Sequence, residues 1–203
     1  MAPEPYNGYL SSFSLLPRIV SMDSNSKPDP SPALIQKLTV SYDEREDRLL
    51  LAAQCEDGEA QGLWLTQRLT RPLVKVLLGR LDDAVSADTA RIREDHRSVM
   101  QAWEQSAAAI RQAHSEPVTV SPEDEHGLID TVNVVCLANG DFQLVFHWPE
   151  GNALSFPVSS TAMRQWLGIL HQQYRRADWP VAGVWPAWFD TAQKTAKQPL
   201  VIH

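Results

Sequence analysis

The sequence has few of the residues from which reactive or metal-binding sites are built. Only two cysteines occur in 203 residues, Cys55 and Cys136, and neither lies in a CxxC or other metal-ligand spacing. They indicate reduced thiols of a cytosolic protein rather than a disulfide framework. A GxSxG element, a P-loop, an HExxH motif and a glycine-rich dinucleotide-binding turn are all missing. We therefore expect a non-catalytic protein with no cofactor, no metal and no catalytic residue.

Basic charge and long apolar runs are also scarce. The chain has 18 Lys and Arg and 25 Asp and Glu, which gives a formal net charge of -7. This negative charge disfavours binding to the phosphates of nucleic acid through the overall electrostatic potential of the protein. No apolar run reaches the ~18 residues of a membrane span, so we expect no membrane partner. Residues 1–5 carry no basic charge ahead of the weakly apolar stretch 9–20. The sequence therefore predicts no signal peptide and a cytoplasmic location.

The strongest pattern that is present is an internal repeat without a gap. A shift of about 93 positions brings Leu49 onto Phe142, and the residues that follow match in the same register. Other matched pairs are Gly58 with Gly151, Leu63 with Phe156, Arg71 with Arg164, and Leu77 with Leu170. A duplicated structural unit is the simplest explanation.

Each copy reads as three short strands followed by an amphipathic helix. The strands are predicted over 38–42, 48–54 and 62–65 in the first copy, and over 131–137, 142–148 and 154–158 in the second. Pro157 indicates an edge position for the last strand, because proline cannot donate to a ladder. Thr66 or Thr70 caps the first helix, and Pro72 favours Thr70 because proline belongs in a first turn. Ser159 or Ser160 caps the second.

We therefore predict an α+β fold built from a tandem βββα repeat, with antiparallel sheets and amphipathic helices. A long helix joins the two units, which pack with pseudo-twofold symmetry, edge to edge or face to face. The predicted boundaries are a flexible leader over 1–32, the first repeat over 33–84, the connecting helix over 85–116, the second repeat over 117–178 and a Trp/Pro-rich tail over 179–203. Residues 33–190 are expected to form one globular domain.

The connecting helix carries a short heptad-like seam. Residues 88–114 contain no Gly or Pro, as expected of a long helix. The seam residues alternate in spacings of four and three: Ile92, His96, Val99, Trp103, Ser106 and Ile110. They either pack on the domain's own sheets or form a homodimer interface through this helix.

The C-terminal tail concentrates aromatic residues that are interleaved with Pro180 and Pro186. Trp179, Trp185, Trp188 and Phe189 fall within eleven residues. The tail either folds back to seal an open face of a sheet or presents a recognition surface for an unidentified protein partner. The cluster Glu123 to His126 reads as a solvated loop, although a carboxylate and imidazole group could in principle hold a metal.

The element order of the two copies, carried by runs such as Leu154 to Tyr174, resembles PUR-repeat and Whirly-type proteins. This resemblance implies single-stranded nucleic-acid binding, with bases stacked on aromatic side chains of curved sheets. It stands as an alternative function beside a non-catalytic interaction or assembly module, with an enzyme of unrecognised class as a third. The nucleic-acid contacts would be Arg164, Arg175, Arg176, Trp148 and Trp166. The candidate partner contacts are Trp103, Trp179, Trp185, Trp188, Phe189, Arg164, Arg175 and Arg176.

Overall fold

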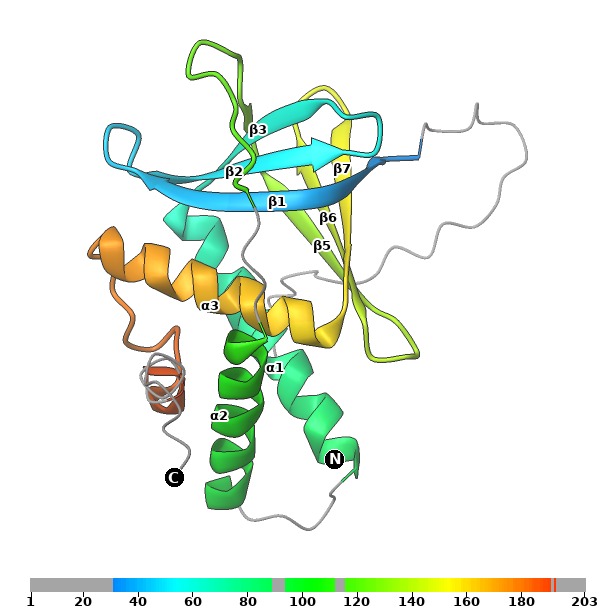
Figure 1. The fold of residues 1–203 in the computed structure, drawn as a ribbon. Helices are drawn as coiled ribbons and strands as arrows, with labels where there is room; N and C mark the ends of the chain where they lie inside the picture. Colours follow the sequence, from blue (N-terminus) through cyan, green and yellow to red (C-terminus); the bar gives the residue numbers. More distant parts are fainter. Residues whose placement is uncertain (1–30, 89–93, 112–115, 191, 193–203) are drawn as a thin grey trace, which may run out of the picture. The chain divides into compact units, whose positions relative to one another are not determined.

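The computed structural model describes residues 31–88, 94–111, 116–190 and 192 (Figure 1). The chain divides into two compact units, Met1–Ser31 and Pro32–His203, and every element below lies in the second. The predicted leader falls almost wholly outside the described residues, as does Ile92 of the predicted seam. Among the described helices, none has the length and apolar character needed to cross a membrane.

Seven strands and three long helices form the described part of the second unit. Strands predicted over 48–54, 131–137 and 142–148 are present at nearly those bounds. A helical turn over 187–190 follows the last long helix. In chain order the elements are β1 (Ala33–Asp43), β2 (Arg48–Cys55), β3 (Ala60–Leu65), α1 (Gln67–Asp88), α2 (Glu94–Ile110), β4 (Gly127–Leu128), β5 (Thr131–Cys136), β6 (Phe142–Trp148), β7 (Asn152–Val158) and α3 (Ser160–Arg176).

Helix α1 begins earlier than Pro72 suggested. The amide nitrogens of Leu69 and Thr70 donate to the carbonyl oxygen of Thr66 at 3.1 and 2.9 Å, and the Leu69 amide also lies 3.3 Å from the Thr66 hydroxyl. Thr66 is therefore the cap, and Pro72 lies inside the helix. The prediction that Thr70 starts the helix is wrong, because the Thr66 cap fixes the first turn and Pro72 removes only one later hydrogen bond.

The strands of the described residues join one mixed sheet in the order β4-β3-β2-β1-β7-β6-β5. The predicted tandem βββα repeat with two antiparallel sheets in pseudo-twofold packing is therefore wrong. Strand β1 begins at Ala33 instead of Leu38, and the added length pairs in parallel with β7, Ala33 opposite Leu154 and Leu34 opposite Ser155. Strand β4 adds a second parallel pairing at β3. Local alternation predicts hairpins, but it does not show which strand edges meet.

The parallel junction also corrects the placement of β7. Pro157 led us to expect an edge strand, yet β7 lies between β1 and β6. Pro157 stands opposite Gln143 of β6, two residues beyond Ser155, which is the last residue of β7 that pairs with β1. An interior strand therefore tolerates this proline, because only one neighbouring strand is present at its position.

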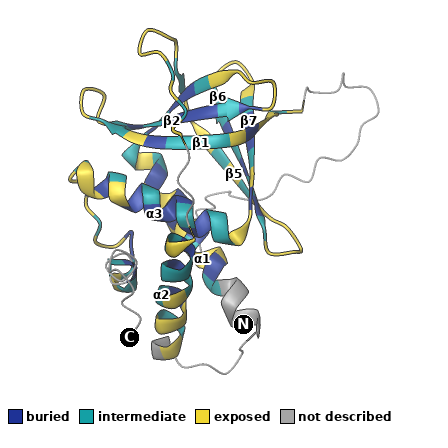
Figure 2. Cartoon of the chain, in the orientation of Figure 1, coloured by how far each residue is buried: buried dark blue, intermediate teal, exposed yellow. Residues whose placement is uncertain are grey.

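One apolar core serves both halves of the sheet. A register shift between Ile35 and Lys37 marks a bulge in β1, and the β1–β3 and β5–β7 halves run in clearly different directions (Figure 1). Helix α3 crosses beneath the sheet, and its buried side contributes to the same cluster as the strands (Figure 2). The largest fully buried members include Tyr174, Phe146, Phe189, Leu49, Leu51 and Leu144. The two copies of the sequence pattern therefore fold around one interior.

The opposite face of β1–β3 is crossed by the segment that leads to β4 (Figure 1). The Val118 amide donates to the Thr39 hydroxyl at 2.8 Å, and the Ile129 amide donates to the Trp64 carbonyl at 3.0 Å. The His126 ring lies directly against Gly62, and Trp148 lies against Gly127. The segment therefore packs on the sheet through aromatic rings laid on glycine backbone.

Candidate interaction surfaces

Helix α2 buries a polar stripe. Gln101, Gln105 and Ala108, spaced by four and three residues, are 3%, 0% and 2% exposed. The Gln105 side-chain amide donates to the Arg164 carbonyl at 2.8 Å, and the Gln101 amide donates to the Leu81 carbonyl at 3.2 Å. These bonds fasten α2 to α3 and to α1. Buried glutamines at this spacing are the sequence signal for the inner face, and the sequence-based prediction missed it.

The opposite side of α2 is apolar and exposed. Val99 and Trp103 are each 66% exposed, Ile110 is 55% exposed and Met100 is 37% exposed; we call these four residues the α2 apolar face. At 3.6 residues per turn, Trp103 and Ile110 lie opposite the buried glutamine stripe. Figure 2 shows exposed segments along this helix. The helix is therefore inverted relative to the usual amphipathic arrangement, with amides inside and hydrocarbon outside.

The predicted seam consequently does not pack on the domain's own sheet. His96 is exposed, and Ser106 is half-buried, with its hydroxyl donating to the carbonyls of Ala102 at 2.8 Å and Ala192 at 3.2 Å. The remaining described seam residues belong to the α2 apolar face. The homodimer interpretation of the spacing stays a prediction.

The aromatic tail lies on the fold as far as Phe189. Trp179, Trp185 and Phe189 are buried and Trp188 is half-buried. The Trp179 ring packs edge-on to Tyr174, with 5.1 Å between ring centroids, and its indole nitrogen donates to Asp47 at 2.9 Å. The tail is therefore buried against α3 and the β1–β2 turn, and not over an open face of the sheet as the sealing interpretation expected. Only Trp188 keeps part of its surface available to a partner.

The hydrogen bonds to Asp47 link the tail to the β1–β2 turn. The Tyr42 hydroxyl also donates to Asp47 at 2.9 Å, and both bonds lower the pKa of that carboxyl group, the Trp179 bond more strongly. Asp47 adopts a φ of 49°, which is unusual for a residue other than glycine. The sequence-based prediction missed the role of this turn as a hydrogen-bond acceptor for the tail.

A buried histidine joins α3 to the end of the tail. His171 is 2% exposed, and its Nε2 lies 3.3 Å from the Asp190 carboxylate, which also pairs with Arg175 at 3.4 Å. The imidazole contacts the rings of Trp185 and Phe189 at 4.9 and 5.0 Å. Burial lowers the pKa of His171, Asp190 opposes this change and Arg175 adds to it. The imidazole therefore packs among the aromatic rings that join α3 to the tail.

The basic residues named for nucleic acid do not gather on one surface. Arg164 is buried, and burial lowers its pKa while Glu104 opposes the shift. Trp166 is also buried, whereas Arg175 and Arg176 are exposed at the end of α3. Single-stranded nucleic-acid binding stays a prediction, without a shared face among these residues.

The acidic loop before β4 does not form a metal site. Glu123, Asp124 and Glu125 are exposed, and His126 turns inward, with its ring centroid 5.4 Å from that of Trp64. Within the described ranges, no group of three or more His, Cys, Asp or Glu side chains is placed to hold a metal ion. His126 here serves the packing of the covering segment.

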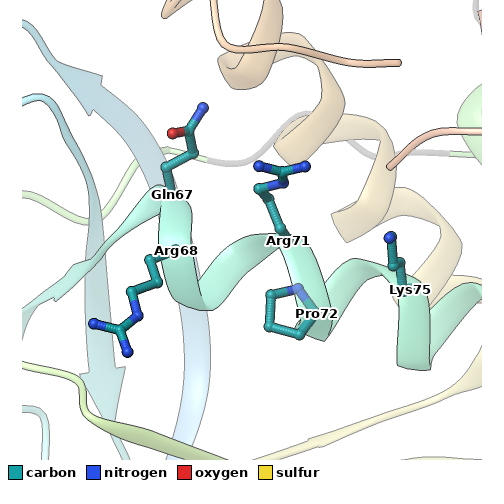
Figure 3. Close-up of a pocket in the computed structure, with 5 residues that line it drawn as sticks. All are labelled: Gln67, Arg68, Arg71, Pro72 and Lys75. Atoms are coloured by element: carbon teal, nitrogen blue, oxygen red, sulfur yellow. The ribbon is translucent and has the colours of Figure 1, made fainter. Parts of the chain in front are cut away.

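A shallow open depression lies over the first turns of α1 (Figure 3). Its volume is about 450 Å³, and its lining is Gln67, Arg68, Arg71, Pro72 and Lys75. Gln67, Arg71 and Lys75 point to one side of the helix in Figure 3, whereas Arg68 points to another. The four-residue spacing of these side chains is visible in the sequence, but it was overlooked because the net charge of the chain is negative.

Comparison of the chain with protein-family models, with curated proteins and with solved structures finds no match.

Proposed function

We propose that this protein is a non-catalytic assembly module that self-associates through the α2 apolar face. The observation that carries the proposal is the inversion of α2: Gln105 is fully buried while Trp103 is two-thirds exposed. An exposed row of large apolar residues on a helix is typical of a contact surface. Burying a side chain of this size contributes about 1.5–3 kcal/mol. Association therefore removes the largest unfavourable surface of the helix from water.

A second copy of the chain fits this face in an antiparallel arrangement. Trp103 then lies opposite Ser106 of the second copy, and Val99 lies opposite Ile110 of the second copy. The bulkiest residue thus meets a small one, which is the size match that knobs-into-holes packing requires. The positions beside the face are alanines at 102, 107 and 109, and small side chains allow two helices to approach closely.

Two charged residues of α2 interact within the chain. Arg97 pairs with Asp82 at 3.6 Å, and Glu104 acts electrostatically on Arg164. At 3.6 residues per turn, both lie nearer to the buried glutamine stripe than to the α2 apolar face.

The size of the surface sets the expected strength. A helix of 17 residues is about 26 Å long. One such helix per partner falls below the roughly 800 Å² per partner of stable complexes. We therefore expect a reversible dimer with a dissociation constant on the order of micromolar.

The free thiols of Cys55 and Cys136 support a reducing compartment, and we propose a cytoplasmic location for the protein.

Light scattering on a size-exclusion column tests the proposal. The wild-type chain is expected to shift from monomer mass towards dimer mass as the loaded concentration rises through tens of micromolar. Trp103→Glu should remain monomeric, because a buried unpaired carboxylate opposes association. Val135→Glu, which changes an exposed valine of β5, is the matched control and should dimerise like the wild type. A monomeric wild type at every concentration, or equal dimerisation of both variants, contradicts the proposal.

A further inference from the structure

The cations over the first turns of α1 are not neutralised within the described part of the fold. Arg68, Arg71 and Lys75 are exposed, and none of them forms an ion pair among the described residues. The lining of the depression contains no carboxylate. The chain as a whole has a net charge of -7, but three unpaired cations give this depression a locally positive electrostatic potential. Such a depression attracts an anion.

Three of the lining side chains form a row of donors. Gln67, Arg71 and Lys75 follow each other at intervals of four residues and extend to the same side of α1 (Figure 3). Each interval corresponds to about 6 Å along the helix axis. The row is therefore elongated, and it suits an anion with several charged groups in line better than a single carboxylate. Gln67 is also the first residue of α1, where the helix dipole favours negative charge.

One member of the row, Arg71, acts electrostatically on the aromatic cluster of α3 and the tail. Burial raises the pKa of Tyr174 to about 12, and the positive charge of Arg71 opposes this rise. The charge of Arg71 therefore reaches the buried phenol. The Tyr174 ring contacts Trp179 and Trp185, with centroids 5.1 and 5.7 Å apart. A charge bound at Arg71 should consequently alter tryptophan emission.

We propose that Gln67, Arg71 and Lys75 bind a small anion that carries phosphoryl groups in a chain. Arg71 offers a planar fork that matches two phosphoryl oxygens, and Lys75 adds a point charge one turn away. The Gln67 amide donates a further hydrogen bond. The negative net charge favours a small ligand over a long nucleic acid, which would meet repulsion beyond the row.

The test is a titration of the full chain with inorganic tripolyphosphate at low salt, followed by calorimetry and by tryptophan emission. Saturable binding that weakens as salt rises is expected. The double variant Arg71→Gln with Lys75→Gln should weaken binding at least about tenfold, as expected for the loss of two charge-assisted contacts. Arg80→Gln, an exposed arginine of α1 outside the depression, should bind like the wild type. Circular dichroism and thermal melting check that each variant is folded.

A nucleoside triphosphate, titrated in the same way, identifies the source of the phosphoryl chain. Tighter binding than tripolyphosphate shows a nucleotide ligand, and equal binding shows recognition of the phosphoryl chain alone; both outcomes support the site. Absence of saturable binding at millimolar concentration overturns the proposal. Unchanged affinity in the double variant, or binding of a single-stranded oligonucleotide without binding of tripolyphosphate, overturns it as well.

Discussion

Two glycines of the sheet region carry aromatic rings directly against their backbone. A Cβ atom on Gly127 would stand 2.7 Å from the Trp148 ring, and one on Gly62 would meet the His126 ring. Both rings are only partly buried, so burial alone does not reveal how tightly they are placed. Glycine is needed at these positions because a side chain would push the covering segment off the sheet.

We expect Gly127→Ala to lower the free energy of unfolding by about 1–3 kcal/mol, because overpacking forces Trp148 to move. Gly79→Ala is the matched control, since nothing lies within 4 Å of the Cβ position of this glycine in α1. That change should stabilise the protein by about 0.5–1 kcal/mol, because alanine favours the helix. Urea unfolding curves measure both effects. Equal midpoints for the two variants would show that Trp148 does not lie against this backbone.

The buried amides of α2 lead to a prediction at the scale of the element. Gln105→Ala removes the 2.8 Å bond to the Arg164 carbonyl and leaves a small void between α2 and α3. We expect a loss of about 1–3 kcal/mol in the free energy of unfolding. Gln172→Ala, at an exposed position of α3, should change it by no more than about 0.5 kcal/mol. Chemical denaturation distinguishes them, and a neutral Gln105→Ala would argue that α2 is not fastened through this residue.

The tail element should respond to acid through His171. The groups facing its imidazole are Asp190, Arg175, Trp185 and Phe189. Because burial lowers its pKa in the folded state, the unfolded state binds the proton more readily. Stability is therefore fully present above the unfolded pKa near ~6.5 and falls as the pH decreases from there to the lowered folded value. Each unit of lowering corresponds to about 1.4 kcal/mol.

Thermal melting between pH 7.5 and pH 5 measures this dependence. His171→Phe keeps an aromatic ring in the cluster and has no proton to bind, so its melting temperature should decline less over the same range. His147→Phe replaces a partly exposed histidine of β6 and serves as the control. Parallel pH profiles for the wild type and His171→Phe would show that the imidazole does not oppose protonation.

The sequence predicted the local elements well because their signals are local. Strand β6 follows from the alternation between Phe142 and Trp148. The seam of α2 was also visible as a periodic pattern. Periodicity shows that a helix has two faces, but it does not show which face is buried. In α2 the glutamines are buried and the tryptophan is exposed, because α1 and α3 offer backbone carbonyl groups that accept hydrogen bonds from the glutamine amides. Tertiary contacts therefore decided the orientation.

At the scale of the whole second unit, the incorrect prediction concerned strand pairing. The gap-free similarity of the two sequence segments suggested two antiparallel sheets in pseudo-twofold packing, yet β1 pairs in parallel with β7 through Ala33 and Leu34. Neither residue carries a distinctive signal, and parallel pairing between distant segments leaves no local pattern. The row of Gln67, Arg71 and Lys75 was missed for a related reason, because a negative net charge conceals a local basic surface.

The most direct test of the central claim follows Trp103 itself. Fluorine NMR of the chain labelled with 5-fluorotryptophan, with Trp103 assigned through Trp103→Phe, reports the surroundings of each indole. The Trp103 signal should show a solvent-isotope shift at low concentration and should move as the concentration rises through the micromolar range, while the signals of Trp179 and Trp185 stay fixed. A Trp103 signal that is shielded from solvent when dilute, or that does not change with concentration, would contradict an outward-facing α2 that assembles with a second copy.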